Sequence, residues 1–230
     1  MFAAQGGEPV YARVKGTKQQ PERAGKFGIH QEGGSVEVQI PVCNSAQGLA
    51  SATAKGLRLV VNRTGLPIWC GHQVDFEAPD PGEVVAFNAY TGRRTLEQMS
   101  ASQFAGGHIH IGVKRSGLTA AVMALFCDKY IGLLLVEHDK QPKRRGLFGA
   151  AGTYRHKPYG VEYRTPSNFW AINDDARIVA TSGAERVARL LANEPMESLL
   201  REYRGTRWAD VRHAIDAEDE GMAEQLMRCD

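Results

Sequence analysis

The sequence has no long hydrophobic run, no CxxC motif and almost no net charge. Its longest apolar run, residues 131–136, is far too short to cross a bilayer, so we expect no membrane contact. The cysteines Cys43, Cys70, Cys127 and Cys229 are scattered, which favours reduced thiols in a cytoplasmic protein (the host cytoplasm, if phage-encoded) over a zinc clip or a disulfide framework. A net charge of +2 gives no overall field for nucleic acid, so any anion binding must be local.

The composition is that of an ordinary globular protein. Hydrophobic residues make up 43% of the chain and charged residues 23%, enough for one sizeable core. Residues 1–12 lack the basic start and apolar segment of a signal peptide. The last third predicts amphipathic helices at 184–192, 196–203 and 208–227 and carries no recognisable chemistry. We therefore divide the chain into residues 1–175 and a helical C-terminal extension, 176–230.

Apolar periodicity and turn residues predict the elements upstream. The expected elements are a hairpin within residues 1–17 turning at Gly6–Gly7, a polar loop at 16–28, a strand at 35–40, a helix capped by Ser45 and running to Asn62, a strand at 68–76, a turn at 78–83, a loop within 84–100, a strand at 108–111 and a helix at 118–130.

A further strand is expected at 161–165, and three of the expected strands, at 35–40, 108–111 and 161–165, are polar on one face and apolar on the other. The polar pairs, each two residues apart, are Glu37 with Gln39, His108 with His110, and Glu162 with Arg164. If these strands share a mixed or antiparallel sheet backed by helices, their polar faces line one concave surface. Carboxylates there suit magnesium or manganese completed by substrate phosphates, and arginines would neutralise phosphoryl charge.

Each signal has a plainer interpretation. The two histidines could be structural, or could form a zinc or iron site, although no third nitrogen or sulfur ligand is evident. Glu162 and Arg164 could form a simple ion pair. Arg144 and Arg145 could be solvated surface residues. Residues 16–18 are not a phosphate-binding loop, because GxxxxGK[ST] is absent.

Four segments make the chain recognisable: GGHIHIG (106–112), RRGLFGAAGTYRHKPYGVEYRTPSNFW (144–170), and the weaker GSVEVQIP (34–41) and FNAYTG (87–92). They resemble the phage-type carboxylate–amine (COOH–NH2) ligases of the glutamine synthetase and glutamate–cysteine ligase superfamily. The resemblance covers about residues 5–175. It implies an α+β fold in which a curved, largely antiparallel sheet forms a glutamine synthetase-like bowl backed by helices.

The resemblance also implies an activity. ATP and Mg2+ (or Mn2+) would activate a small-molecule or peptide carboxylate as an acyl phosphate, and an amine would then displace phosphate to give an amide. Matched to the family pattern, Glu37 and Glu162 would bind metal, and His108, His110 and Lys157 would lie at the nucleotide. The catalytic arginines would be Arg164, Arg144, Arg145 and Arg155.

The sequence departs from the family pattern at two points. The family opens with a strand bearing an acidic DPE-like motif, whereas here no acidic pair precedes the Gly6–Gly7 turn, so we expect weak magnesium–ATP binding and little or no ligase turnover by this form. Gln39 stands where Asn often follows the first glutamate. Two alternatives to an active ligase therefore stay open: an inactive ligase-fold binding or structural protein, and a zinc hydrolase using His108, His110 and Glu162.

Overall fold

The computed structural model describes residues 3–6, 8–10, 13–32, 35–69, 73–75, 83–98 and 102–228. Every statement about the structure concerns these residues. Residues 78–82 of the predicted turn at 78–83 lie outside them, and so do Cys70 and Cys229.

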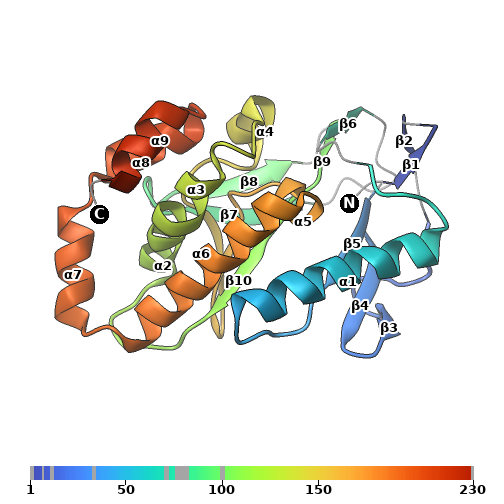
Figure 1. Ribbon diagram of the computed structural model, residues 1–230, viewed down its shortest axis with the longest axis horizontal. Coiled ribbons are helices and arrows are strands. Elements are labelled where there is room, and N and C mark those ends of the chain that lie inside the picture. Colours follow the sequence, from blue (N-terminus) through green and yellow to red (C-terminus); the bar gives the residue numbers. More distant parts are fainter. Residues whose placement is uncertain are drawn as a thin grey trace.

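The main sheet has five antiparallel strands in the order β10-β12-β11-β7-β8 (Figure 1). Strand β10 comes from one part of the chain, and β11 with β12 forms a hairpin that follows it by forty residues or so along the sequence. The strands are β7 (Glu83–Asn88), β8 (Arg94–Gln98), β10 (Ile109–Gly112), β11 (Thr153–Lys157) and β12 (Gly160–Tyr163).

Helices cover one face of this sheet. Ile109, Ile111, Val161 and Tyr163 point from β10 and β12 into the largest core, where α2 (Ala120–Cys127) and α6 (Asp174–Asn193) pack against them. Figure 1 shows α6 lying across the sheet beside α1. Because side chains alternate along a strand, the residues between these apolar positions must face the opposite side.

A smaller unit comes from the N-terminal part of the chain. Its three-stranded antiparallel sheet has the order β3-β4-β5, and α1 packs on β5 and on α6. The Glu185 carboxylate of α6 accepts a hydrogen bond from the Ala46 N–H at the start of α1 (2.9 Å), which joins the two units. The elements are β3 (Glu22–Ala24), β4 (Phe27–Glu32), β5 (Ser35–Gln39) and α1 (Ala46–Thr64), with two short pairs, β1 (Ala3–Gln5) with β2 (Glu8–Val10) and β6 (Gln73–Asp75) with β9 (Ser102–Phe104).

The remaining elements are helical. α2 continues through a π-helical turn, η1 (Asp128–Gly132), into α3 (Leu133–Leu135). The others are α4 (Pro142–Leu147), α5 (Phe169–Ile172), α7 (Met196–Gly205), α8 (Trp208–Asp216) and α9 (Glu220–Arg228). Within the described ranges, no helix is both long and apolar enough to cross a membrane.

Several sequence predictions are confirmed. The fold is α+β with antiparallel sheets. Ser45 caps α1 by accepting a hydrogen bond from the Gly48 N–H, and Gly65 ends that helix with a left-handed backbone (φ 68). The strand at 35–39 and the hairpin β1-β2 are present, and β6 lies within the strand expected at 68–76. The division into 1–175 and 176–230 stays a prediction; α6, which begins at Asp174, packs on the main core.

Three predictions are wrong. The polar loop expected at 16–28 contains β3 and the start of β4, because Gly25 allows a tight turn (φ +63) that places Phe27 in the core. The loop expected within 84–100 is the hairpin β7-β8. The single helix expected at 208–227 is two helices, since the chain turns between them at Glu218, where φ is 54.

A buried acid lies in the π-helical turn behind β12. Asp128 is fully buried and accepts a hydrogen bond from the Tyr163 hydroxyl (2.6 Å). Burial raises its pKa from 3.8 to about 7, although the Tyr163 hydrogen bond opposes the shift. In the folded state the carboxyl therefore keeps its proton between about pH 4 and pH 7, where the unfolded chain has released it. Stability conferred by this group is present at low pH and falls as the pH rises through that window.

Replacing Asp128 with Asn should remove this loss of stability at higher pH. The amide is never charged, and its oxygen can still accept a hydrogen bond from the Tyr163 hydroxyl. Relative to the parent protein, Asp128→Asn should gain melting temperature as the pH is raised from 5 to 8. Thermal unfolding at several pH values measures the difference. Glu137→Gln, on an exposed position, serves as the control and should shift equally at all pH values. A constant difference for Asp128→Asn as well would contradict the assigned pKa.

Candidate functional site

A row of ionisable side chains crosses three neighbouring strands. The register aligns His110 of β10 with Glu162 of β12, and Glu162 with Arg155 of β11. All three side chains lie on the face opposite the α2–α6 core, as the period-2 pattern predicts. Arg164, two residues beyond Glu162, lies on that same face and contacts its carboxylate.

Glu162 is the centre of this row and is only 2% exposed. Its Oε2 lies 2.7 Å from Lys157 Nζ and 3.4 Å from Arg155 Nη1, while its Oε1 is bound by Arg164. Burial alone would raise the pKa of Glu162, but the groups around it outweigh burial and lower the pKa to about 2. The site therefore holds a permanent carboxylate amid three cations, with a net positive charge.

His108, immediately before β10, contacts the same cluster. Its Nδ1 lies 3.5 Å from Glu162 Oε1 and 3.4 Å from Arg164 Nη1. Burial, with the Arg164 charge adding to it, holds the pKa of His108 well below its ordinary 6.5, so the ring is neutral at pH 7. His110 is exposed, stacks on Tyr159 with ring centroids 6.0 Å apart, and shares a short hydrogen bond with that hydroxyl.

A second group of charges lies on the N-terminal sheet. Burial, followed by the neighbouring Glu32 carboxyl, raises the pKa of Glu37 to about 8, so that one proton is held between the two acids at pH 7. Lys18 Nζ lies 3.1 Å from Glu32 Oε1. The buried His30, aligned with Glu37 across β4 and β5, has its Nε2 3.8 Å from the Glu37 carboxylate. Burial lowers the pKa of His30, so it stays neutral.

Apart from the buried His30, both groups line one cavity of about 1110 Å³. Its walls come from β5, α1, β10, β11, β12 and α6, and lysine and arginine outnumber carboxylates among the lining residues. The structure thus brings together eight of the nine predicted site residues: Glu37, His108, His110, Arg144, Arg155, Lys157, Glu162 and Arg164. Sequence reasoning missed Glu32 and Lys18, because it did not predict β4.

Arg145, the ninth, lies outside the residues that line the cavity. It is 5% exposed, and its guanidinium donates to the carbonyls of Gly149 (2.9 Å) and Thr165 (2.8 Å) and pairs with Asp139 (3.3 Å). Arg144 does line the cavity, yet its guanidinium donates to the carbonyls of Thr165 and Arg164. The two adjacent arginines therefore both hold backbone carbonyls in or next to the segment that carries Arg164.

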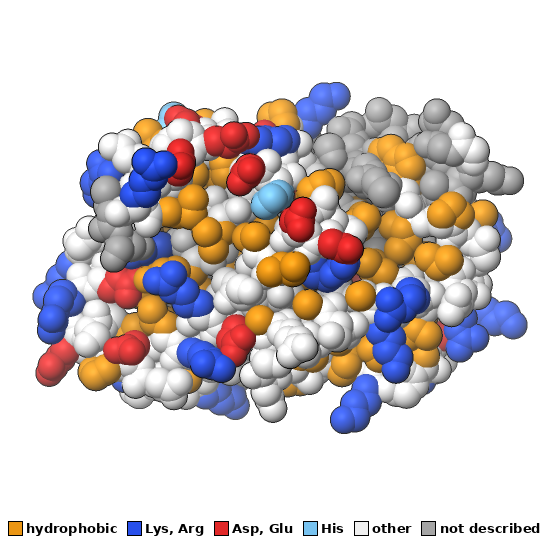
Figure 2. Space-filling model, viewed as in Figure 1, with side chains coloured by type: hydrophobic (Ala, Val, Ile, Leu, Met, Phe, Trp, Pro, Cys, Tyr) orange, Lys and Arg blue, Asp and Glu red, His pale blue; other side chains and the backbone are white. Residues whose placement is uncertain are grey.

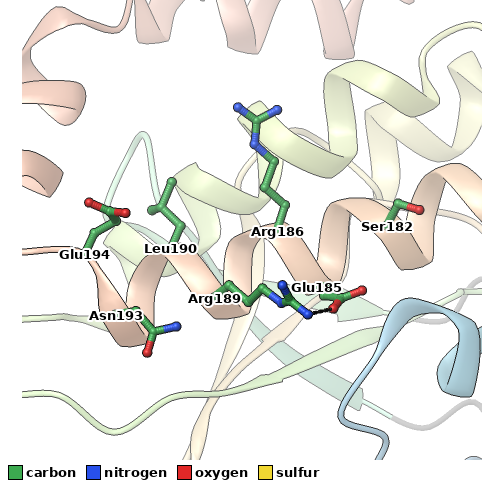
Figure 3. A pocket seen from close by; sticks show the side chains of 7 residues that line it. All are labelled: Ser182, Glu185, Arg186, Arg189, Leu190, Asn193 and Glu194. Atoms are coloured by element: carbon green, nitrogen blue, oxygen red, sulfur yellow. Dashed lines mark ion pairs between the residues drawn. The ribbon is translucent and has the colours of Figure 1, made fainter.

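A shallower hollow of about 520 Å³ lies along α6 (Figure 3). Glu185 pairs with Arg189 across one helical turn, and the Arg186 guanidinium stacks over the Tyr130 ring, 4.2 Å from its centroid. Three of its charged groups, Glu185, Arg186 and Arg189, thus already have structural contacts. On the face drawn in Figure 2, acidic and basic side chains are interspersed and do not gather into one large patch. The larger cavity is therefore the candidate site.

The fold and the cavity define an α+β protein whose largest described cavity has a buried carboxylate among an excess of cationic side chains. Residues 95–205 match the family model for the Phage phiEco32-like COOH.NH2 ligase-type 2 proteins, which confirms the resemblance to the phage-type carboxylate–amine ligases. The matched segment contains β10, β11, β12 and most of the helical core, whereas Glu32 and Glu37 lie before it. No curated protein and no solved structure matches the chain.

Proposed function

We propose that this protein is an ATP-dependent ligase that joins a carboxylate to an amine through an acyl phosphate. The observation that carries the proposal is the buried Glu162 carboxylate, held by Arg155, Lys157 and Arg164 in a large cavity of a ligase-family chain. We also propose that the β5 and β10 sheets together form the concave bowl of the glutamine synthetase superfamily. The family match and the position of both sheets around one cavity support this arrangement.

The proposed reaction needs charge stabilisation more than a protein nucleophile. A carboxylate resists attack by an amine because oxide is a poor leaving group. Its oxygen attacks the γ-phosphorus of ATP, releasing ADP and giving the acyl phosphate; the amine then attacks the acyl carbon, and phosphate leaves as the nitrogen loses a proton. Arg155, Lys157 and Arg164 are fixed before the substrates arrive, so they can stabilise phosphoryl and carboxylate charge without reorganising.

The residues present fit magnesium at one of the two predicted positions. Glu32 and Glu37 are adjacent carboxyls that hold a proton between them, and a hard divalent cation could replace it with their oxygens as ligands. Bound there, magnesium would neutralise nucleotide phosphate charge. Glu162, by contrast, already has three cationic partners, so we propose it as their counterion instead of a metal ligand.

The zinc-hydrolase alternative fits these residues less well. His108 Nδ1 lies against the Arg164 guanidinium at 3.4 Å, and a cation bound there would be repelled by it. Among the described residues no cluster of three or more histidine, cysteine or acidic side chains has the geometry of a metal site.

Trapping the acyl phosphate tests the ligase. Hydroxylamine, a small and general amine acceptor, should give hydroxamates and ADP when the protein is mixed with magnesium–ATP and a set of amino acids and short peptides. Arg164→Lys should lower turnover by about 10- to 100-fold, because an ammonium cannot reproduce the guanidinium contacts to an anion. Arg93→Lys, on an exposed turn, is the matched control and should leave turnover unchanged. Neither ADP nor hydroxamate from the parent protein would instead favour the inactive binding protein.

A further inference from the structure

The cavity runs between the edges of two sheets. Within the described residues, β10 pairs only with β12, and β5 pairs only with β4. The lining includes unbroken runs of both segments, 105–113 and 35–46. Consecutive side chains of a strand point to opposite faces, so a cavity on one face would be lined by every second residue only. Because every residue of these two strands lines the cavity, the cavity lies along the edge of each strand.

Hydrogen bonds across the main sheet show which backbone groups lie on that edge. The Arg164 N–H donates to the Thr153 carbonyl of β11 (2.9 Å). Backbone groups alternate in direction along a strand, so those of Glu162 also point to β11, and those of Val161 and Tyr163 point to β10. Their partners there are Ile111 and Ile109. The N–H and C=O groups of His110 and Gly112 must therefore point away from β12, to the cavity.

The same reasoning applies to the opposite wall. The Gln31 N–H donates to the Gly16 carbonyl (2.9 Å), on the β3 side of β4, so the backbone groups of Ile29 point that way as well. Ile29 is aligned with Val38, whose N–H and C=O then point outward from β5. Both walls of the cavity thus present strand-type donors and acceptors.

We propose that the carboxylate substrate is a peptide, bound in extended conformation along the outer edge of β10. This inference rests on the proposed ligase function and names its substrate class. An extended chain presents N–H and C=O groups at the spacing of His110 and Gly112, which a small amino acid cannot match. The cavity of about 1110 Å³ also exceeds the roughly 300–1,000 Å³ typical of small-ligand pockets, leaving room for a nucleotide.

The position of the edge also explains how such a peptide would meet the charges. A side chain on the His110 face of the added strand would lie about 5 Å from His110, with Glu162 one strand further. A glutamate or aspartate side chain, or a C-terminal carboxylate, extends across that distance toward Arg164 and Lys157. The excess of cationic over acidic side chains among the lining residues complements an acidic peptide.

Gly112 allows one edge hydrogen bond to be removed by itself. Its N–H lies outside the β10–β12 ladder, and a Cβ built there meets nothing closer than the Tyr159 carbonyl at 4.0 Å. Gly112→Pro removes the outward N–H, while Gly112→Ala adds the side-chain atom and keeps the N–H. The two variants thus differ mainly in this one donor.

The experiment supplies magnesium–ATP, hydroxylamine and either free glutamate or a pool of random heptapeptides that each contain one glutamate. Mass spectrometry measures hydroxamates and bound peptides. We expect the parent protein and Gly112→Ala to modify peptides. Gly112→Pro should have about tenfold lower kcat/KM for peptides, as for the loss of one hydrogen bond. The rate of hydroxamate formation from free glutamate should be the same for all three proteins. Modification of free glutamate alone, or equal peptide rates for the Pro and Ala variants, would overturn the peptide assignment and leave the ligase standing. If neither substrate gives hydroxamate, the proposed ligase activity is wrong. If peptides then still bind, and bind more weakly to Gly112→Pro, the outer edge of β10 is still a peptide-binding site.

Discussion

Glu162→Gln is expected to destabilise the protein and to strengthen its binding of anions. The carboxylate is 2% exposed and is the common partner of Arg155, Lys157 and Arg164, so removing its charge leaves three cations close together. Breaking a buried ion pair by deleting one partner costs about 3–5 kcal/mol, and the partial exposure of Lys157 and Arg155 reduces this to about 2–4 kcal/mol. A phosphate ion could then take the place of the carboxylate.

Urea unfolding with and without inorganic phosphate measures both effects. Phosphate should restore much of the lost stability in Glu162→Gln and have a smaller effect on the parent protein. Glu37→Gln is the matched control: Glu37 is already protonated at pH 7, so the same substitution should change stability by less than about 1 kcal/mol. If Glu162→Gln instead leaves stability unchanged and abolishes only magnesium-dependent nucleotide binding, Glu162 is the metal ligand that the resemblance implies.

The alternation of residues along strands predicted the centre of this site. Val161 and Tyr163 face the helical core, while Glu162 and Arg164 face the cavity, as period-2 geometry requires. The equal pattern at 108–111 likewise separates His110 from Ile109 and Ile111. Such patterns are reliable because burial on one face fixes the register of a strand.

Two strands that contribute to the site, β4 and β11, could not be predicted from the alternation of polar and apolar residues. β4 was missed because Gly16 to Gly28 is polar in composition, although Gly33–Gly34 before the strand at 35–39 is a hairpin signal that could have indicated it. β11 was missed because its Arg155, His156 and Lys157 resemble a solvated basic segment. The packing of its neighbours, which cannot be read from local sequence, makes it a central strand.

The two adjacent arginines show a further limit. Composition makes Arg144 and Arg145 equally suited to bind phosphate, but they lie on α4, whose short turn directs them to different surroundings. Arg144 reaches the cavity wall, whereas Arg145 is held among backbone carbonyls and Asp139. Only tertiary contacts show that both guanidiniums bind backbone carbonyls and that, of the two, Arg144 also lines the cavity.

Arg145→Gln should therefore impair folding more than ligand binding. Asp139 is 1% exposed, and its carboxylate accepts from the Ser167 N–H (2.9 Å) and hydroxyl (2.6 Å) as well as pairing with Arg145. Loss of the guanidinium leaves this buried charge without its cation and removes one donor from each of the carbonyls of Gly149 and Thr165, of which Thr165 keeps its bond from Arg144. We expect the free energy of unfolding to fall by about 3–5 kcal/mol. Lys143→Gln, on the exposed side of the same helix, should change it by less than about 0.5 kcal/mol.

Anion binding separates this role from a catalytic one. At a temperature where Arg145→Gln is still folded, it should bind phosphate within about twofold of the parent protein, because none of its contacts faces the cavity. Calorimetric titration of both proteins with phosphate gives the comparison. Normal stability combined with a tenfold or greater loss of phosphate affinity would place Arg145 at the anion, as the resemblance implies, and would require the segment after β12 to rearrange when ligand binds.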